Sequence, residues 1–201
     1  MASLRNGSSR FLPVIAATSL LAIVVSASPL LAQGGPSGFT LGTGLAYGFD
    51  RFDGAKGVEN AFGWDLRGGY RAGYVGADVG LQYFPSFDVA HDETSGEIKD
   101  LLIGANVKVY PLPDWSFEPY ALAGVGMTRI ESDTETVVVE GEDPVKSSDK
   151  DTGVVLRFGA GFEFSISEGT AVFFEGSYVL DLDRNPDADI VPIVGGIRLL
   201  F

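Results

Sequence analysis

One short segment carries side chains from which hydrolytic chemistry could be assembled. The segment VAHDETSG, residues 89–96, contains the only histidine of the chain, His91, close to Asp92, Glu93 and Ser95. Acid–base or nucleophilic catalysis needs a histidine held at hydrogen-bonding distance from a serine or a carboxylate. We expect this acidic stretch to be a loop tip, where nothing fixes such a geometry. The sequence therefore predicts no catalytic residues and no enzymatic activity.

Cation binding is a second chemistry that two acidic stretches could support. The segments Glu131–Asp151 and Asp181–Ile190 are rich in carboxylates, and hard oxygen ligands of this kind suit calcium or magnesium. Neither segment fits the EF-hand pattern. Solvating surface charge is therefore the first interpretation, with no cofactor and no metal site, and divalent cations at these acidic loops are the alternative.

Ten further charged residues share a different setting, because each lies on the polar face of an alternating segment. The acidic members are Asp65, Asp78, Glu118, Glu163 and Glu175, and the basic members are Arg67, Arg71, Lys108, Arg157 and Arg198. The two signs balance. Since charges removed from water must be paired, the set predicts an internal network of ion pairs.

The elements that would position these charges are strands, because apolar residues recur at every second position from Phe39 onward. Eight such segments are predicted: residues 39–49, 62–71, 75–83, 101–110, 118–127, 154–164, 172–180 and 191–201. The apolar face of these segments carries no charge, while the opposite face is largely glycine with the scattered charges described above. Pro192 cannot donate a ladder hydrogen bond, so we expect broken or bulged pairing there.

The connections between these segments alternate in length. Short ones are predicted at 72–73, 111–115 and 165–169, and long acidic ones at 50–60, 85–100, 129–151 and 181–189. A stretch of strand propensity, TVVVE at 136–140, suggests that the fifth and sixth strands project as a hairpin. Eight antiparallel strands with tight turns at one end form a closed up-and-down β-barrel, and the chain is therefore all-β.

Alternation alone fits both a transmembrane barrel and a soluble, lipocalin-like barrel that buries its apolar face around a ligand. A balanced, glycine-rich inner face and aromatic residues near the strand ends favour the transmembrane form, in which the apolar face meets lipid. Segments of nine to eleven residues also have the length that crosses a bilayer at a tilt.

The first residues have the pattern of a secretory signal peptide. Arg5 and Arg10 precede an apolar run without acids that ends in small residues. We expect residues 1–32 to be removed after Ala32, or alternatively after Ala27, leaving a short lead-in at 33–38 and the barrel at 39–201. An uncleaved membrane anchor is the alternative. No cysteine is present, which excludes a lipid-modified cysteine and disulfides.

The chain without its leader is strongly acidic. Its 12 basic and 27 acidic residues give a net charge of −15, which argues against nucleic acid and against anionic lipid as partners. No remaining stretch is long and apolar enough for a transmembrane helix.

At this point the chain resembles the OmpA/OmpX-type eight-stranded outer-membrane barrels of Gram-negative envelopes. The resemblance covers residues 39–201 and rests on the architecture and on segments such as GADVGLQYF, EPYALAGVGM and GVVLRFGAGFEF. It implies a location in the outer membrane, a periplasmic N-terminus, extracellular long loops, and contact with outer-membrane lipid and lipopolysaccharide. It also implies that the last strand, which ends in Phe201, is the signal read by the outer-membrane assembly machinery.

The function expected from this resemblance is structural, or a surface interaction through the acidic loops. A bore of eight strands is just filled by side chains, and we expect Tyr74, Tyr110, Tyr120 and Phe173 to obstruct it further. A narrow small-solute channel is the main alternative, and a soluble lipocalin-like binder is the third.

Overall fold

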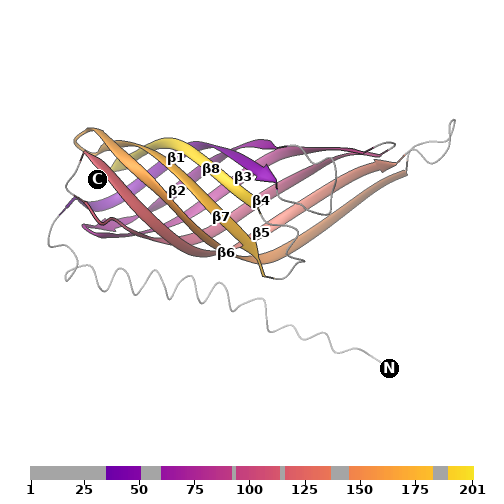
Figure 1. Cartoon of the computed structure of the whole chain (residues 1–201). Helices are drawn as coiled ribbons and strands as arrows, with labels where there is room; N and C mark the ends of the chain where they lie inside the picture. Colours follow the sequence, from indigo (N-terminus) through magenta and orange to yellow (C-terminus); the bar gives the residue numbers. More distant parts are fainter. Residues whose placement is uncertain (1–34, 51–59, 92–93, 114–115, 137–144, 183–189) are drawn as a thin grey trace, which may run out of the picture.

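A computed structural model describes residues 35–50, 60–91, 94–113, 116–136, 145–182 and 190–201. Its strands are β1 Ser37–Asp50, β2 Ala61–Ala72, β3 Val75–His91, β4 Thr94–Val109, β5 Phe117–Thr136, β6 Val145–Ser167, β7 Thr170–Asp181 and β8 Ile190–Leu200. Each strand pairs antiparallel with its neighbours in chain order, and β1 also pairs with β8. The predicted all-β, closed, eight-stranded barrel is confirmed (Figure 1).

The barrel is inverted relative to a soluble protein. Apolar side chains on its outer wall are open, with Leu45 and Phe62 both 73% exposed. Charged side chains inside it are closed off, with Asp65, Lys108 and Glu175 each 1% exposed. A soluble barrel places these two kinds of residue the other way round. The outer wall therefore suits lipid, and the lipocalin-like alternative does not fit.

One end of the barrel, which we call the turn end, carries the tight connections. Gly73 and Gly169 lie in the β2–β3 and β6–β7 turns with φ of 56° and 78°, values that favour glycine because it lacks a Cβ. The last residue also lies at this end, where the backbone N–H of Phe201 donates to the carbonyl of Phe39 over 2.9 Å. The strand order therefore brings the start of β1 and the end of the chain together.

The opposite end, which we call the long-strand end, differs from the sequence prediction. Two of the predicted long loops, 85–100 and 129–151, are largely strand, because β3 runs to His91, β4 begins at Thr94, β5 runs to Thr136 and β6 begins at Val145. These four strands extend beyond the others in Figure 1. The predicted projection of the fifth and sixth strands is thus present, although residues 137–140 of the TVVVE segment lie outside the described part of the chain. Period-two alternation did not predict the other extensions, because a strand that lies outside the lipid needs no apolar face.

A glycine and a proline determine how β8 pairs with its two neighbouring strands. A Cβ on Gly44 would lie 2.6 Å from the carbonyl oxygen of Gly195, so β1 approaches β8 closely only because Gly44 has none. The β7–β8 ladder pairs Gly176 with Ile193 and then Val179 with Ile190, so Val191 and Pro192 have no partner on β7. On its other side Pro192 still pairs with Gly48 of β1. The predicted break at this proline is confirmed, without a change of register.

No helix among the described residues is long and apolar enough to span a membrane. The predicted leader, residues 1–32, lies outside the described part of the chain.

Candidate functional site

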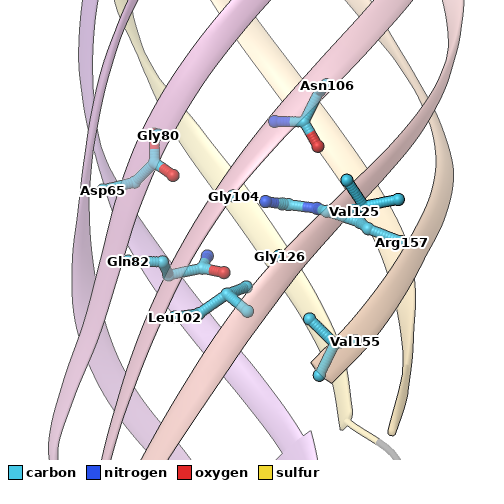
Figure 2. A pocket seen from close by; sticks show the side chains of 10 residues that line it. All are labelled: Asp65, Gly80, Gln82, Leu102, Gly104, Asn106, Val125, Gly126, Val155 and Arg157. Atoms are coloured by element: carbon cyan, nitrogen blue, oxygen red, sulfur yellow. The ribbon is translucent and has the colours of Figure 1, made fainter. Parts of the chain in front are cut away.

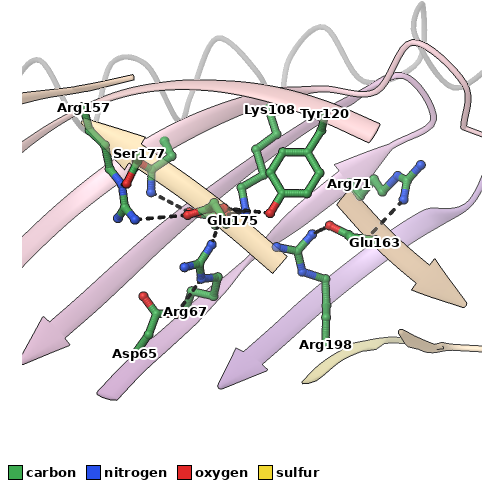
Figure 3. Close-up of polar contacts among 12 residues, drawn as sticks. Asp65, Arg67, Arg71, Lys108, Tyr120, Arg157, Glu163, Glu175, Ser177 and Arg198 are labelled. Atoms are coloured by element: carbon green, nitrogen blue, oxygen red, sulfur yellow. Dashed lines mark hydrogen bonds and ion pairs between the residues drawn. The ribbon is translucent and has the colours of Figure 1, made fainter. Parts of the chain in front are cut away.

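The middle of the bore is organised around one carboxylate, Glu175 on β7. It lies 2.8 Å from a guanidinium nitrogen of Arg67, 3.1 Å from Lys108 Nζ and 3.0 Å from a guanidinium nitrogen of Arg157. The hydroxyl of Tyr120 also donates to it over 2.8 Å. Figure 3 shows these four groups, which come from β2, β4, β5 and β6, converging on Glu175. We call them the central cluster.

Two more carboxylates complete the charge of the central cluster. Asp65 lies 2.6 Å from Arg67 Nε, and Asp78 lies 3.0 Å from Lys108 Nζ and accepts a 2.8 Å hydrogen bond from the Asn106 amide. Three acids thus meet three bases at the centre of the bore. Because all six charges are at least 93% buried, their pairing is what makes their burial tolerable.

A second group of charges, the turn-end cluster, closes the bore near the tight turns. Arg71 donates two hydrogen bonds to Glu118, of 2.7 and 3.1 Å, and its guanidinium stacks 3.8 Å from the ring centre of Tyr110. Glu163 accepts hydrogen bonds from the Tyr110 hydroxyl, at 2.8 Å, and from Arg198. Two parallel hydrogen bonds from a guanidinium to a carboxylate fix the relative orientation of the two groups and neutralise their charges. The turn-end cluster therefore closes the bore with paired charges.

All ten charges predicted for the interior therefore lie buried in the bore, in these two clusters. The structure places Asp65, Arg67, Asp78, Lys108, Arg157 and Glu175 in the central cluster and Arg71, Glu118, Glu163 and Arg198 in the turn-end cluster.

Apolar side chains fill the bore between the central cluster and the long-strand end. Phe84 and Phe87 pack with ring centres 5.3 Å apart and are joined by Ala46, Ala61 and Val194. Leu102, Val155 and Val179 form a second apolar group. Figure 2 shows Gln82, Leu102 and Arg157 pointing into the bore, around a cavity of only about 10 Å³. Such a space holds no solute larger than water.

Of the four bulky residues expected to obstruct the bore, three do so. Tyr110, Tyr120 and Phe173 are at most 3% exposed. The prediction for Tyr74 is wrong, because this side chain is 42% exposed. Tyr74 lies in the turn between β2 and β3, where the alternation of neither strand applies.

Sequence reasoning missed two buried carboxylates. Asp100 on β4 is 3% exposed and accepts a hydrogen bond from Thr128, and Asp181 at the end of β7 is 7% exposed. Both were assigned to acidic loops. For Asp100 the alternation of the strand was the available signal, because Asp100 falls on the same face of β4 as Leu102 and Asn106, which point into the bore.

The other sequence candidates stay apart from these clusters. His91 is the last residue of β3, and its side chain, with Asp92, Glu93 and Ser95, lies outside the described part. No group of three metal-ligating side chains occurs among the residues that the structure describes. Phe201 stands on the outer wall, 73% exposed.

The outer wall changes from apolar to charged within a few residues at the long-strand end. One row of cross-strand neighbours, Leu81, Ile103, Met127 and Val154, is entirely apolar. The next row towards the long-strand end runs Trp64, Tyr83, Leu101, Arg129 and Thr152. The row after that runs Lys99, Glu131 and Lys150. An aromatic pair followed by charge is typical of a membrane–water boundary.

Ion pairs order the charged row beyond this boundary. Glu131 lies 2.8 Å from a guanidinium nitrogen of Arg129 and 3.1 Å from Lys150 Nζ. The hydrogen bond from Lys150, together with the nearby charge of Arg129, lowers the pKa of the Glu131 carboxyl. Glu131 therefore remains ionised at neutral pH.

The chain matches known proteins in family and fold. Residues 17–192 match the family described as "Outer membrane protein beta-barrel domain". No curated protein matches in sequence. Among solved structures, Neisserial surface protein A is 18% identical, with a TM-score of 0.59, over 82% of this chain and 98% of its own. A major outer membrane protein of Thermus thermophilus is 10% identical, with a TM-score of 0.62, over 81% and 99%.

A third similar structure is Ail, the attachment invasion locus protein of Yersinia pestis, in complex with the heparin analogue sucrose octasulfate. It is 15% identical, with a TM-score of 0.54, over 84% of this chain and 100% of its own. At these identities the solved structures establish the fold.

Proposed function

Because the chain belongs to the outer membrane protein beta-barrel domain family, we propose that it is a closed, non-catalytic barrel of the Gram-negative outer membrane whose role is envelope structure or surface interaction. The observation that carries this proposal is the filling of the bore at successive levels. The turn-end cluster, the central cluster and the apolar group around Phe84 and Phe87 follow one another along it. A solute would have to break ion pairs as well as displace aromatic rings.

The proposed orientation places the turn end in the periplasm and the long-strand end outside the cell. Both ends of the barrel segment lie at the turn end, which fits delivery of the chain from the periplasm. The polar extensions of β3–β6 would then stand above the membrane and offer a surface to partners. Phe201, at the turn end, is proposed as the residue that the assembly machinery reads.

Conductance of the refolded protein in a planar bilayer tests the closed bore. Insertion is confirmed by the difference in gel mobility between unheated and boiled samples. We expect inserted but electrically silent protein. Steady conductance, reduced or altered in ion selectivity by Arg157→Gln, would contradict the closed bore and establish transport.

Surface labelling tests the orientation independently. Since the chain has no cysteine, Ser147→Cys on β6 and Glu168→Cys at the turn end each give one unique thiol. An impermeant maleimide added to whole cells should modify the first variant and spare the second. The reverse pattern would overturn the orientation.

A narrow small-solute channel remains the second candidate. The observation that favours it is a hollow of about 320 Å³ at the turn end, lined in part by Arg71, Glu118, Glu163 and Arg198. The hollow leads onto the turn-end cluster, where the ion pairs described above close it. The conductance measurement decides between the two candidates.

A further inference from the structure

Three glycines make room in the inner wall of the barrel, next to the central cluster. Gly80, Gly104 and Gly126 are cross-strand neighbours on β3, β4 and β5, and each alternates along its strand with side chains that point into the bore. Because none of the three carries a side chain, the cavity of about 10 Å³ shown in Figure 2 remains open at this level. This is about the smallest space that holds a single water molecule.

The lining of this cavity suits a neutral ligand that both donates and accepts hydrogen bonds. Four of the lining side chains are polar and at least 93% buried: Asp65, Gln82, Asn106 and Arg157. One acid and one base thus face the same small space, so a bound ion of either sign would meet a like charge. A water molecule, in contrast, can accept a hydrogen bond from the guanidinium of Arg157 and donate one to the carboxylate of Asp65.

Gln82 is the residue that points to a ligand in this cavity. Its side chain is 1% exposed, and neither its amide nitrogen nor its amide oxygen has a hydrogen-bond partner among the residues that the structure describes. A buried amide without hydrogen bonds destabilises a fold. Since Gln82 itself lines the cavity, a water molecule bound there lies within reach of this amide.

We propose that this cavity binds one ordered water molecule, which hydrogen-bonds to the amide of Gln82 and links it to Asp65 and Arg157 of the central cluster. The water lies where the bore changes from charged to apolar, because Leu102 and Val155 line the same cavity. A bridging water contributes nearly as much as a direct hydrogen bond, so it connects Gln82 to the ion pairs of the bore. The inference goes beyond the proposed function and requires only the folded barrel.

Nuclear magnetic resonance of the refolded protein in detergent micelles detects such a water directly. The chain holds two glutamines, Gln33 and Gln82, so isotopic labelling of glutamine yields two side-chain amide signals, which the variant Gln82→Met assigns. We expect a direct dipolar cross-peak between the NH₂ protons of Gln82 and water. The absence of a cross-peak would overturn the site, and so would a cross-peak that arises only from exchange of the amide protons with bulk solvent.

A double-mutant cycle tests what the water contributes to stability. A Cβ on Gly80 would meet only ordinary contacts, with Arg67 Cβ and the Leu66 carbonyl oxygen each at 3.6 Å, so Gly80→Ala places a methyl group in the cavity without a clash. In the wild type this methyl group displaces the water and leaves the Gln82 amide without a partner, whereas Gln82→Met has no amide to leave unpaired. In urea unfolding, the effect of Gly80→Ala on the folding equilibrium constant should therefore be about tenfold less favourable in the wild type than in Gln82→Met.

The matched control is Gly176→Ala, because a Cβ there would have nothing within 4 Å. It should change stability equally in the wild type and in Gln82→Met. Equal effects of Gly80→Ala in the two backgrounds would overturn the proposal, since the filling of a dry cavity does not depend on the amide. Loss of the gel-mobility shift in a variant would reveal misfolding, and the magnetic-resonance measurement on the unmodified protein then decides alone. Conductance in planar bilayers tests the closed bore separately, so the two proposals can fail independently.

Discussion

The central cluster should depend on the charge of Glu175 for stability. In Glu175→Gln the shape is kept, but Arg67, Lys108 and Arg157 are left around a neutral amide whose NH₂ group is itself a donor. Arg67 retains Asp65 and Lys108 retains Asp78, whereas Arg157 retains only the Ser177 hydroxyl, 3.0 Å away, among its described contacts. One positive charge is then uncompensated in the bore.

Breaking a buried ion pair by removing one partner costs about 3–5 kcal/mol. We expect a loss of this size for Glu175→Gln, which is roughly a hundredfold to several thousandfold in the folding equilibrium constant. Urea-induced unfolding from phospholipid vesicles, followed by tryptophan fluorescence and by heat-dependent gel mobility, measures it. Glu131→Gln, at an exposed pair on the outer wall, should change stability far less, because solvent screens the interaction.

A second substitution isolates the electrostatic cause. Lys108→Met removes one cation from the central cluster, so that the double variant Glu175→Gln/Lys108→Met again balances two acids, Asp65 and Asp78, against Arg67 and Arg157. The double variant should be destabilised by clearly less than the sum of the single variants. A Glu175→Gln protein within about 1 kcal/mol of wild type would refute the reasoning, since the bore would then solvate unpaired charge.

Three further outcomes follow from the packing and from the last residue. Gly44→Ala should cost about 1–3 kcal/mol in urea unfolding, because its Cβ would press on the Gly195 carbonyl, whereas Gly176→Ala, with nothing within 4 Å, should be near neutral. Phe87→Ala should cost about 3–5 kcal/mol yet leave planar bilayers silent, because the central cluster still closes the bore; open conductance would contradict this. Deleting Phe201 should lower the heat-modifiable protein in cell membranes but spare refolding in detergent, and equal losses would make its role purely structural.

The sequence was sufficient to predict the fold and the ten charges that form the two clusters in the bore, but not Asp100 and Asp181. Period-two alternation located every strand, and the balance of charge on the glycine-rich face identified the residues that are buried together. The partners of each charge could not be read, because the stagger of a closed barrel decides which inward positions meet. Nothing in the sequence distinguished Glu175 as the carboxylate that pairs with Arg67, Lys108 and Arg157.

Predictions failed where the apolar signal stops. Asp100 and Asp181 lie beyond the apolar stretch of their strands, so the alternation did not predict that their side chains point into the bore. Tyr74 was expected in the bore, but it lies in a turn, where the alternation of a strand does not decide the direction of the side chain.

The pairing of β1 with β8 has a consequence for how this barrel folds. Its ladder joins Thr40 to Leu200 and Asp50 to Ile190, so it unites contacts that are separated by nearly the whole barrel sequence. Contacts between distant parts of a chain are slow to form, because the entropy of closing the loop is lost before the contact is gained. One edge of β1 pairs with β2, and the other stays unpaired until β8 is available. Until then the seam presents an open strand edge that favours aggregation, so the closure of this barrel depends on its last strand.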